Sequence, residues 1–309
     1  MSGLAPEDIP DALFEALSDD ERDSEFIAMD SKTYFQDAWG RFRKNRLALA
    51  GFVFILLMIA CAVAIPMGVP DAYSAQNLAV RNQPPSLGHL FGTDKFGRDI
   101  LARVMYGARI SLSVGFAAAL LNLLIGVLYG GFCGYVGGKA DLILMRVVDI
   151  LYSVPSLLYV ILIMLVFGSN IISVLIAISI SSWVGMARQV RAQVLSLKEQ
   201  EFALAARISG AGRAHILFRH LIINCVGPII VTTTLMVPNA IFTEAFLAFV
   251  GIGISIPMAS WGTMANEARA QLLDYPIQMF WPVAAICLTM LSLYFIGDGM
   301  SEALDPRKR

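Results

Sequence analysis

Six apolar runs, each close to the length needed to cross a lipid bilayer, constrain this chain more than any other feature. A bilayer core about 30 Å thick is crossed by a helix of about 20 mostly apolar residues. Because lipid offers no hydrogen-bond partners, such runs are expected to be helices, whose backbone groups pair internally. We therefore predict an all-α membrane protein with six transmembrane helices. They are expected at about 47–67, 111–135, 150–168, 171–187, 225–249 and 278–297.

The composition agrees with a membrane protein rather than a soluble one. Hydrophobic residues make up 57% of the 309 residues and charged residues only 15%, whereas soluble domains carry about 25% charged residues. The first apolar run begins near Leu47, too far from the N-terminus for a cleavable signal peptide, so we expect it to persist as a span.

Positive charges predict the orientation. Cytoplasmic loops of membrane proteins carry an excess of Lys and Arg. If the N-terminus is cytoplasmic, most of the 23 Lys and Arg residues fall on the cytoplasmic side. The exception is the long loop 68–110, where acidic residues partly offset the basic ones. We expect both termini to be cytoplasmic.

The segments that precede the first span differ in character. Residues 1–32 hold a dense cluster of Asp and Glu with few apolar residues, which predicts a disordered acidic cytoplasmic tail. In residues 33–46, aromatic side chains recur at helical spacing with basic residues between them. This pattern favours a helix lying in the membrane interface, and a plain basic flank is the alternative. Residues 47–309 then form the transmembrane domain.

The loop 188–222 is polar, basic and helix-prone, although it lies between two apolar runs. We expect the fourth span to continue as a helix to Ser196, and a short second helix to cover 201–209. Gly210 permits a left-handed turn that other residues resist, and a third helix over 213–222 would return to the membrane. The arrangement suits the docking of another protein. An ordinary cytoplasmic loop is the alternative.

Smaller patterns predict local contacts. Gly126, Gly130 and Gly134 recur at four-residue spacing, which lets another helix approach closely. Arg98 and the aspartates of its loop are expected to pair, as are two charges at the inner end of the third span. Residues 251–277 are rich in Trp, Ile and Met for a loop, so we expect this segment to be ordered.

Five segments in the same order resemble the permease subunits of peptide/nickel-class ABC importers, and specifically the C-type subunit of oligopeptide importers. The likeness covers roughly residues 35–309. The segments are LFGTDKFGRDILARVMYGARISLSVG at 90–115, GGKADLILMRVVDILYSVP at 137–155, the loop segment at 201–224, VPNAIFTEAFLAFVGIGISIPMASWGTM at 237–264 and GDGMSEALDPRKR at 297–309.

The resemblance implies a type I ABC importer permease architecture in the plasma (inner) membrane of a bacterium. It implies that the chain forms half of a translocation pathway and that loop 188–222 is a coupling loop for cytoplasmic ATPases. Two departures occur there: Leu204 stands where the motif has Glu, and Ile223 where Pro is usual. The coupling residues would be Glu201, Ala205, Ala206, Gly210, Ala211 and Arg213.

The partners that the resemblance implies are a second homologous permease subunit, one or two cytoplasmic ABC ATPase subunits, an extracytoplasmic peptide-binding protein and the lipid bilayer. No nucleic-acid partner is expected. The candidate phosphate-binding glycines, Gly137 and Gly138, are followed by Lys139 and Ala140, which lack the hydroxyl that would hold Mg²⁺. We therefore expect no enzymatic activity, no catalytic residues and no cofactor in this chain, with ATP and Mg²⁺ bound by the partner ATPases. No cluster of metal-ligating residues is recognised either.

Polar residues at membrane depth are candidates for function. Glu244 and Asn239 lie in the fifth apolar run, and the resemblance implies that this span lines the translocation pathway. A hydrogen bond between helices that fixes their packing is the alternative. Other interpretations of the whole chain are a dipeptide or nickel ABC importer and, less favoured, an ATP-independent secondary transporter, which would be expected to show inverted repeats.

Overall fold

The computed structural model describes residues 33–69, 72–254 and 258–305. The predicted acidic tail, 1–32, lies outside these residues. From Ala38 onward the described chain forms one compact helical unit. Its helices are α2 (Tyr34–Lys44), α3 (Arg46–Gly68), η3 (Leu78–Val80), α4 (Ile100–Val136), α5 (Gly138–Ser153), α6 (Ser156–Phe167), α7 (Ile171–Leu197), α8 (Glu201–Ile208), α9 (Arg213–His215), η4 (Ile216–Ile222), α10 (Val226–Val250), α11 (Trp261–Arg269) and α12 (Ile277–Leu304).

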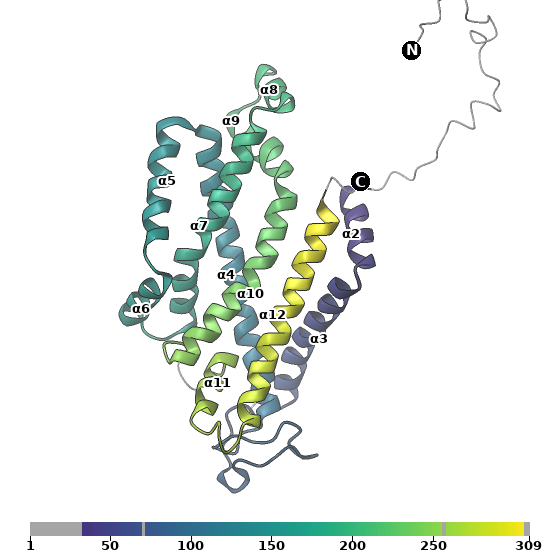
Figure 1. Ribbon diagram of the computed structural model, residues 1–309, viewed down its shortest axis with the longest axis vertical. Helices are drawn as coiled ribbons and strands as arrows, with labels where there is room; N and C mark the ends of the chain where they lie inside the picture. Colours follow the sequence, from purple (N-terminus) through teal and green to yellow (C-terminus); the bar gives the residue numbers. More distant parts are fainter. Residues whose placement is uncertain (1–32, 70–71, 255–257, 306–309) are drawn as a thin grey trace, which may run out of the picture. The chain divides into compact units, whose positions relative to one another are not determined.

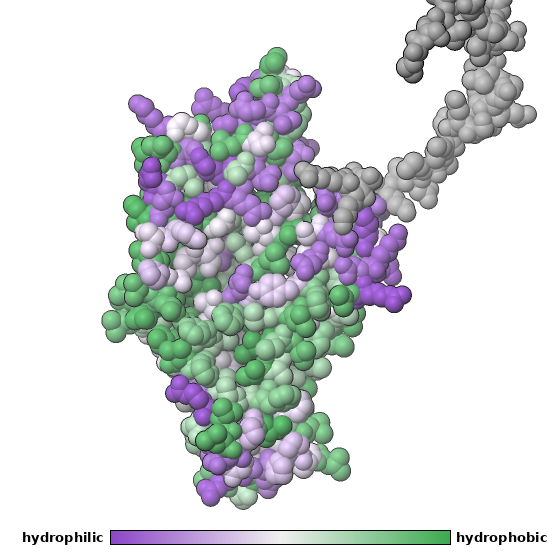
Figure 2. Space-filling view, viewed as in Figure 1, coloured by the Kyte–Doolittle hydropathy of each residue, from purple (hydrophilic) through white to green (hydrophobic). Residues whose placement is uncertain are grey.

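Five of the described helices are long and apolar enough to cross a membrane, namely α3, α4, α7, α10 and α12. Figure 1 shows them side by side, with α8 at one end of the bundle and α11 at the opposite end. Apolar side chains gather along the middle of the bundle, and polar ones gather toward the α8 end (Figure 2). This distribution is typical of a membrane protein. A helix, α2, lies where the interfacial helix is expected, and its place in the interface stays a prediction.

The prediction of one continuous third helix over 150–168 is wrong. The chain bends by 83° between α5 and α6, at a break that contains Val154 and Pro155. Proline has no backbone N–H and pushes the residue before it out of the helical region. Val154 accordingly has an extended backbone, with φ −89° and ψ 127°. With 12 residues, α6 is only about 18 Å long and too short to span a bilayer by itself.

The second span is longer than predicted. Helix α4 has 37 residues and is therefore about 55 Å long, well beyond the bilayer core. It begins 11 residues before the predicted start at 111, because Asp99 caps it by accepting a hydrogen bond from the Ala102 backbone at 2.8 Å. The added turns carry α4 into the loops at the α11 end.

The three glycines at four-residue spacing confirm the predicted close approach. They lie where α4 meets α7, the most extensive helix–helix contact among the described residues. A methyl group on Gly126 would lie 2.6 Å from the Met186 Cβ, and one on Gly130 would lie 2.9 Å from the Ala187 Cα. Only glycine leaves room for these backbones to approach so closely.

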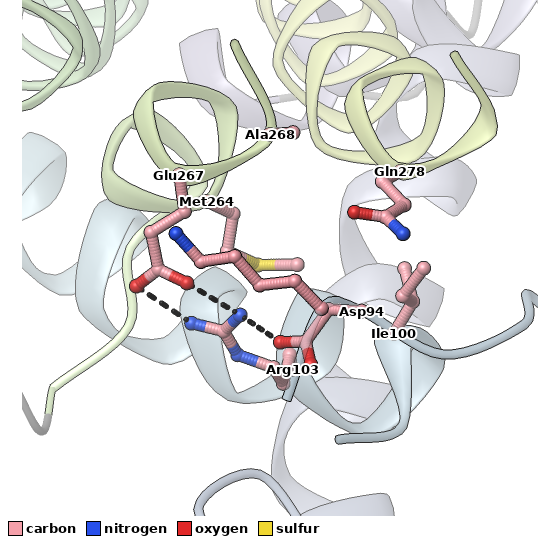
Figure 3. Close-up of a pocket in the computed structure, with 8 residues that line it drawn as sticks. Asp94, Ile100, Arg103, Met264, Glu267, Ala268 and Gln278 are labelled. Atoms are coloured by element: carbon pink, nitrogen blue, oxygen red, sulfur yellow. Dashed lines mark hydrogen bonds and ion pairs between the residues drawn. The ribbon is translucent and has the colours of Figure 1, made fainter. Parts of the chain in front are cut away.

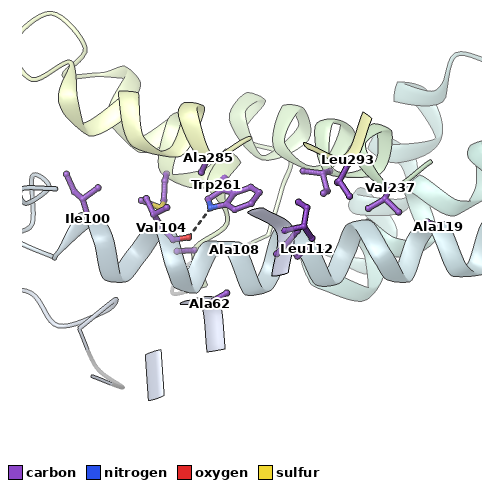
Figure 4. Close-up of a cluster of buried hydrophobic side chains, with 14 residues drawn as sticks. Ala62, Ile100, Val104, Ala108, Leu112, Ala119, Val237, Trp261, Ala285 and Leu293 are labelled. Atoms are coloured by element: carbon purple, nitrogen blue, oxygen red, sulfur yellow. Dashed lines mark hydrogen bonds between the residues drawn. The ribbon is translucent and has the colours of Figure 1, made fainter. Parts of the chain in front are cut away.

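A buried cluster around Trp261 joins α11 to the spans (Figure 4). Trp261 is completely buried, and its indole N–H donates to the Val104 carbonyl of α4 at 2.9 Å. Ala108 of α4 and Ala285 of α12 belong to the same cluster. The expectation that 251–277 is ordered is confirmed for α11.

Candidate functional site

Helix α8 ends in the left-handed turn that its sequence predicts. Gly210 has φ +80°, and the backbone N–H of Ala211 donates to the Ala206 carbonyl at 3.1 Å. The Gly210 N–H donates to the Arg207 carbonyl, also at 3.1 Å. These two bonds form a Schellman motif, in which a residue with positive φ closes the helix and satisfies its last carbonyls. The turn is therefore fixed by backbone hydrogen bonds.

The small side chain of Ala203 holds α8 against the rest of the unit. Ala203 is 1% exposed and belongs to a buried cluster with Val194 of α7 and Ile216, Leu217 and Leu221 of η4. Because alanine adds only a methyl group, α8 lies close to this cluster. A short helix that is anchored in this way can transmit force from its exposed surface into the bundle.

The exposed surface of α8 is more apolar than its surroundings. Ile208 is 88% exposed, and Phe202 and Leu204 are each 39% exposed, at the end of the bundle where polar side chains gather (Figures 1 and 2). Exposed apolar groups outside the membrane belt are typical of interaction sites. Leu204 and Ile208 lie four positions apart and therefore on one side of the helix, whereas Phe202 lies on another side. We call Leu204 and Ile208 the α8 apolar face.

The six predicted coupling residues divide between the exposed surface and the anchored side. Ala206 and Ala211 are half-buried and pack against the buried cluster. The other four are exposed at the surface of the α8 end, namely Glu201, Ala205, Gly210 and Arg213. The structure thus places all six in α8, the turn after it and the first residue of α9.

The two candidate pathway residues do not lie together. They are five positions apart on α10, which places them about 140° apart around the helix. Asn239 is exposed and accepts a hydrogen bond from the Tyr294 hydroxyl at 3.2 Å. Glu244 is 1% exposed, and its Oε2 accepts from the Ser111 hydroxyl of α4 at 2.9 Å. The Glu244 contact has the geometry of a hydrogen bond between packed helices.

A cluster of four charges lies at the α11 end, and we call Asp94, Arg98, Arg103 and Glu267 the α11 charge cluster. Figure 3 shows three of them, Asp94, Arg103 and Glu267. Arg103 is 3% exposed, and its Nη1 contacts Asp94 Oδ2 at 2.7 Å and Glu267 Oε2 at 2.9 Å. Arg98 pairs with Asp94 at 2.7 Å and also contacts Glu267. The cluster joins the loop before α4, α4 itself and α11.

The sequence predicted only part of this cluster. The pairing of Arg98 with Asp94 is confirmed, whereas Asp99 caps α4 and contacts the His89 ring at 2.8 Å. Glu267 was missed because it lies more than 160 residues along the chain from Arg103. In the sequence, the one indication of a structural role for Glu267 was its position in the 251–277 segment, which was expected to be ordered.

A second ion pair joins α5 to α7 near the α8 end. Asp141 accepts hydrogen bonds from Nε and Nη2 of Arg191, both at 2.6 Å, which is the bidentate geometry that arginine and carboxylate favour. The predicted pair of Arg146 and Asp149 is confirmed at 3.7 Å, but Arg188 lies closer to Asp149, at 2.8 Å. The short separation in sequence predicted the longer contact, Arg146 with Asp149. It gave no indication of the pairs that join different helices, Arg188 with Asp149 and Arg191 with Asp141.

The pKa of Glu267 gives the α11 charge cluster a predicted pH dependence. Burial alone would raise this pKa, but the guanidinium groups of Arg103 and Arg98 outweigh it and hold the pKa below its usual range. A carboxylate of this kind stabilises the fold above its unfolded pKa of about 4.3, and the contribution is lost as pH falls through the lower folded value. Replacement by glutamine removes the titrating group.

We expect Glu267→Gln to lower the thermal unfolding temperature of the purified chain most above about pH 5, with a smaller difference from the wild type near pH 3. Scanning fluorimetry across this range measures the difference. The control is Glu199→Gln, an exposed carboxylate at the opposite end. A difference for Glu267→Gln that stays constant with pH would contradict the account.

Comparisons with protein families match most of the chain. Residues 122–309 match the model of the binding-protein-dependent transport system inner membrane component. Residues 33–85 match the model of the N-terminal transmembrane domain of oligopeptide transport permease C. The second match covers α2, α3 and the start of the loop that follows them.

Curated relatives resemble the chain along nearly its whole length. The oligopeptide transport system permease protein OppC of Bacillus subtilis is 47% identical over 98% of this chain and 99% of its own. The dipeptide transport system permease protein DppC of the same organism is 45% identical over 97% and 94%. The OppC protein of Escherichia coli K12 is 40% identical over 93% and 95%.

A solved structure shares the fold at low sequence identity. A chain of the MetNI methionine ABC transporter, in an inward-facing conformation, aligns with a TM-score of 0.53 and 16% identity. The alignment covers 67% of this chain and 96% of that chain.

Proposed function

Because this chain belongs to the family of binding-protein-dependent transport system inner membrane components, we propose that it is the C-type permease subunit of an ATP-driven oligopeptide importer. The family match over residues 122–309 and the 47% identity to a protein named as an oligopeptide permease support this role. The type I permease fold supports it as well. The chain would form half of the translocation pathway in a bacterial plasma membrane.

In the proposed mechanism, two ATPases dimerise at the α8 end when they bind ATP, and the motion of α8 rocks the spans between inward-facing and outward-facing states. Both termini and the α8 end would lie in the cytoplasm. ATP and Mg²⁺ would be bound by the ATPase partners. A second, homologous permease would complete the pathway, and an extracytoplasmic peptide-binding protein would deliver the substrate.

The α8 segment is the observation that carries this proposal. It combines an anchored residue, Ala203, with the exposed α8 apolar face and a turn fixed by backbone hydrogen bonds. A helix of this kind resists bending and offers an apolar surface that a partner can cover. Within the proposal, Asn239 faces the pathway because it is exposed, and Glu244 fixes the contact of α10 with α4.

Substitution of Gly210 tests the coupling role. Gly210→Asp places a side chain at φ +80°, where no heavy atom lies within 4 Å of the added Cβ. The change therefore costs about 1–2 kcal/mol of backbone strain without a steric clash. We expect the bundle to remain folded and ATP-driven peptide uptake to fall by about tenfold or more, because the turn after α8 is altered. Uptake in proteoliposomes that contain the whole transporter measures the effect.

Gly212→Asp is the matched control. Gly212 lies two residues away, is also open to solvent and has a negative φ of −64°. Its variant introduces the same charge without the strain, so we expect a much smaller loss of uptake. Equal uptake by the Gly210→Asp variant and the wild type would remove the coupling role from this turn, as an ATP-independent carrier would predict.

A dipeptide importer is the second candidate function. The identity to the dipeptide permease of Bacillus subtilis, 45%, is nearly as high as that to the oligopeptide permease. Uptake of a labelled dipeptide and a labelled pentapeptide by the same proteoliposomes separates the two. Uptake of the pentapeptide supports the oligopeptide role, and uptake of the dipeptide alone overturns it.

A further inference from the structure

The helix that returns from α8 to the membrane is wound as a π-helix over Ile216–Ile222. Such windings are rare and are often found at functional sites. In an α-helix, side chains five residues apart point about 140° away from each other. With about 4.4 residues per π-turn, the same spacing leaves them only about 50° apart. The winding therefore brings His215 and His220 to the same side of the helix.

The two imidazole rings are separated by a distance that suits a shared metal ion. Their ring centres lie 5.4 Å apart, with the ring planes inclined by 61°. A zinc–nitrogen bond of about 2.1 Å places each ring centre about 3.2 Å from the ion, so two tetrahedral ligands have ring centres about 5.2 Å apart. The observed separation of 5.4 Å is close to this value.

The ring nitrogens of both histidines are available. In the described part of the chain, neither ring makes a hydrogen bond or an ion pair. The third histidine, His89, differs because its Nδ1 contacts Asp99 at 2.8 Å. His215 is exposed and His220 is half-buried, so an ion can reach both from solvent. Asn224 donates to the backbone carbonyl of His220 and leaves the ring free.

The surroundings limit how tightly an ion would bind. The described residues contain no group of three or more His, Cys, Asp or Glu side chains placed to share a metal. Water would therefore complete the coordination. Arg213 and Arg219 lie in the same stretch of chain, and their charges oppose a cation. The ligands must be neutral imidazoles, so binding would weaken in acid.

We propose that His215 and His220 form a two-histidine site for a divalent transition-metal ion such as Zn²⁺ or Cu²⁺. Imidazole nitrogens suit these ions, whereas Mg²⁺ and Ca²⁺ prefer oxygen ligands. A bound ion would join His215, which precedes η4, to the last turn of η4 and so stabilise the π winding. Because Ile216 and Leu217 pack against Ala203 of α8, the site would also stiffen the support of α8. The proposal stands on the geometry of this chain and does not depend on the transport role.

Zinc titration of the full chain tests the site. The chain is purified in detergent through an affinity tag without histidine, and Zn²⁺ is titrated at pH 7.5 against a chromogenic chelator. We expect a Zn²⁺ site of micromolar affinity that is weakened by about tenfold or more in His215→Gln and in His220→Gln. His89→Gln is the matched control and should bind as the wild type does. Unchanged binding in the double variant His215→Gln/His220→Gln would overturn the proposal.

Copper spectroscopy counts the imidazole nitrogens bound to the ion. Electron paramagnetic resonance of the chain with one equivalent of Cu²⁺ reports the nitrogens bound to the ion. We expect the signature of two imidazole nitrogens in the wild type and in His89→Gln, and one in each single variant of the pair. A wild-type spectrum without two imidazole nitrogens would contradict the site. Thermal unfolding checks that each variant is folded.

Discussion

Replacement of Gly130 by leucine is expected to destabilise the protein by about 3 kcal/mol or more, because it forces α4 away from α7. Even the first added atom would lie 2.9 Å from the Ala187 Cα and still closer to the Ala187 carbonyl oxygen. These are backbone atoms, which cannot rotate away as a side chain can. Thermal unfolding of the purified chain in detergent or nanodiscs measures the loss.

Gly185→Leu is the matched control for this prediction. Gly185 lies on the same helix as Ala187, but a Cβ added there would meet no heavy atom within 4 Å. We expect the control to unfold close to the wild-type temperature. If the Gly130 variant is as stable as the control, the contact of α4 with α7 is looser than the structure has it.

Replacement of Arg103 by methionine is expected to cost about 3 kcal/mol, because it leaves the buried Asp94 and the half-buried Glu267 with Arg98 as the one cation of the α11 charge cluster. Arg103 contacts both Asp94 and Glu267 while being 3% exposed. Methionine fills much of the same volume, so the loss reports charge rather than packing. The expected consequence is release of α11, measured as faster hydrogen exchange in Trp261–Arg269 and a lower unfolding temperature.

Two further variants test whether the loss in Arg103→Met comes from the ion pairs. Arg103→Lys keeps a positive charge without the forked geometry, so we expect an intermediate loss. Arg81→Met removes an exposed arginine of the same loop region and should change little. Equal stability of Arg103→Met and Arg81→Met would contradict a structural role for the α11 charge cluster.

Hydropathy and glycine spacing predicted much of the bundle. Five apolar runs became helices that can span a membrane, because lipid favours helices whose backbone groups are paired internally. Gly126 and Gly130 were predicted to lie at a close contact and do. The positive φ at Gly210 was also predictable, since few other residues adopt it.

Other features depend on contacts that a single sequence does not reveal. The bend at Val154 was hidden because the apolar run continues through it, although Pro155 carried a local signal. The pairing of Glu267 with Arg103 joins segments far apart in the chain. The approach of His215 to His220 depends on a π winding, whereas the usual α-helical period would separate them.

Photo-crosslinking in native membranes tests the central claim, that α8 docks an ATPase, most directly. A photoreactive amino acid is placed at Ile208 of the α8 apolar face, which is 88% exposed, and in a second variant at Leu273 near the α11 end, which is 98% exposed. The account predicts a crosslink to an ABC ATPase from position 208 and none from position 273. An ATPase crosslink at 273, or its absence at 208 in an assembled transporter, would contradict it.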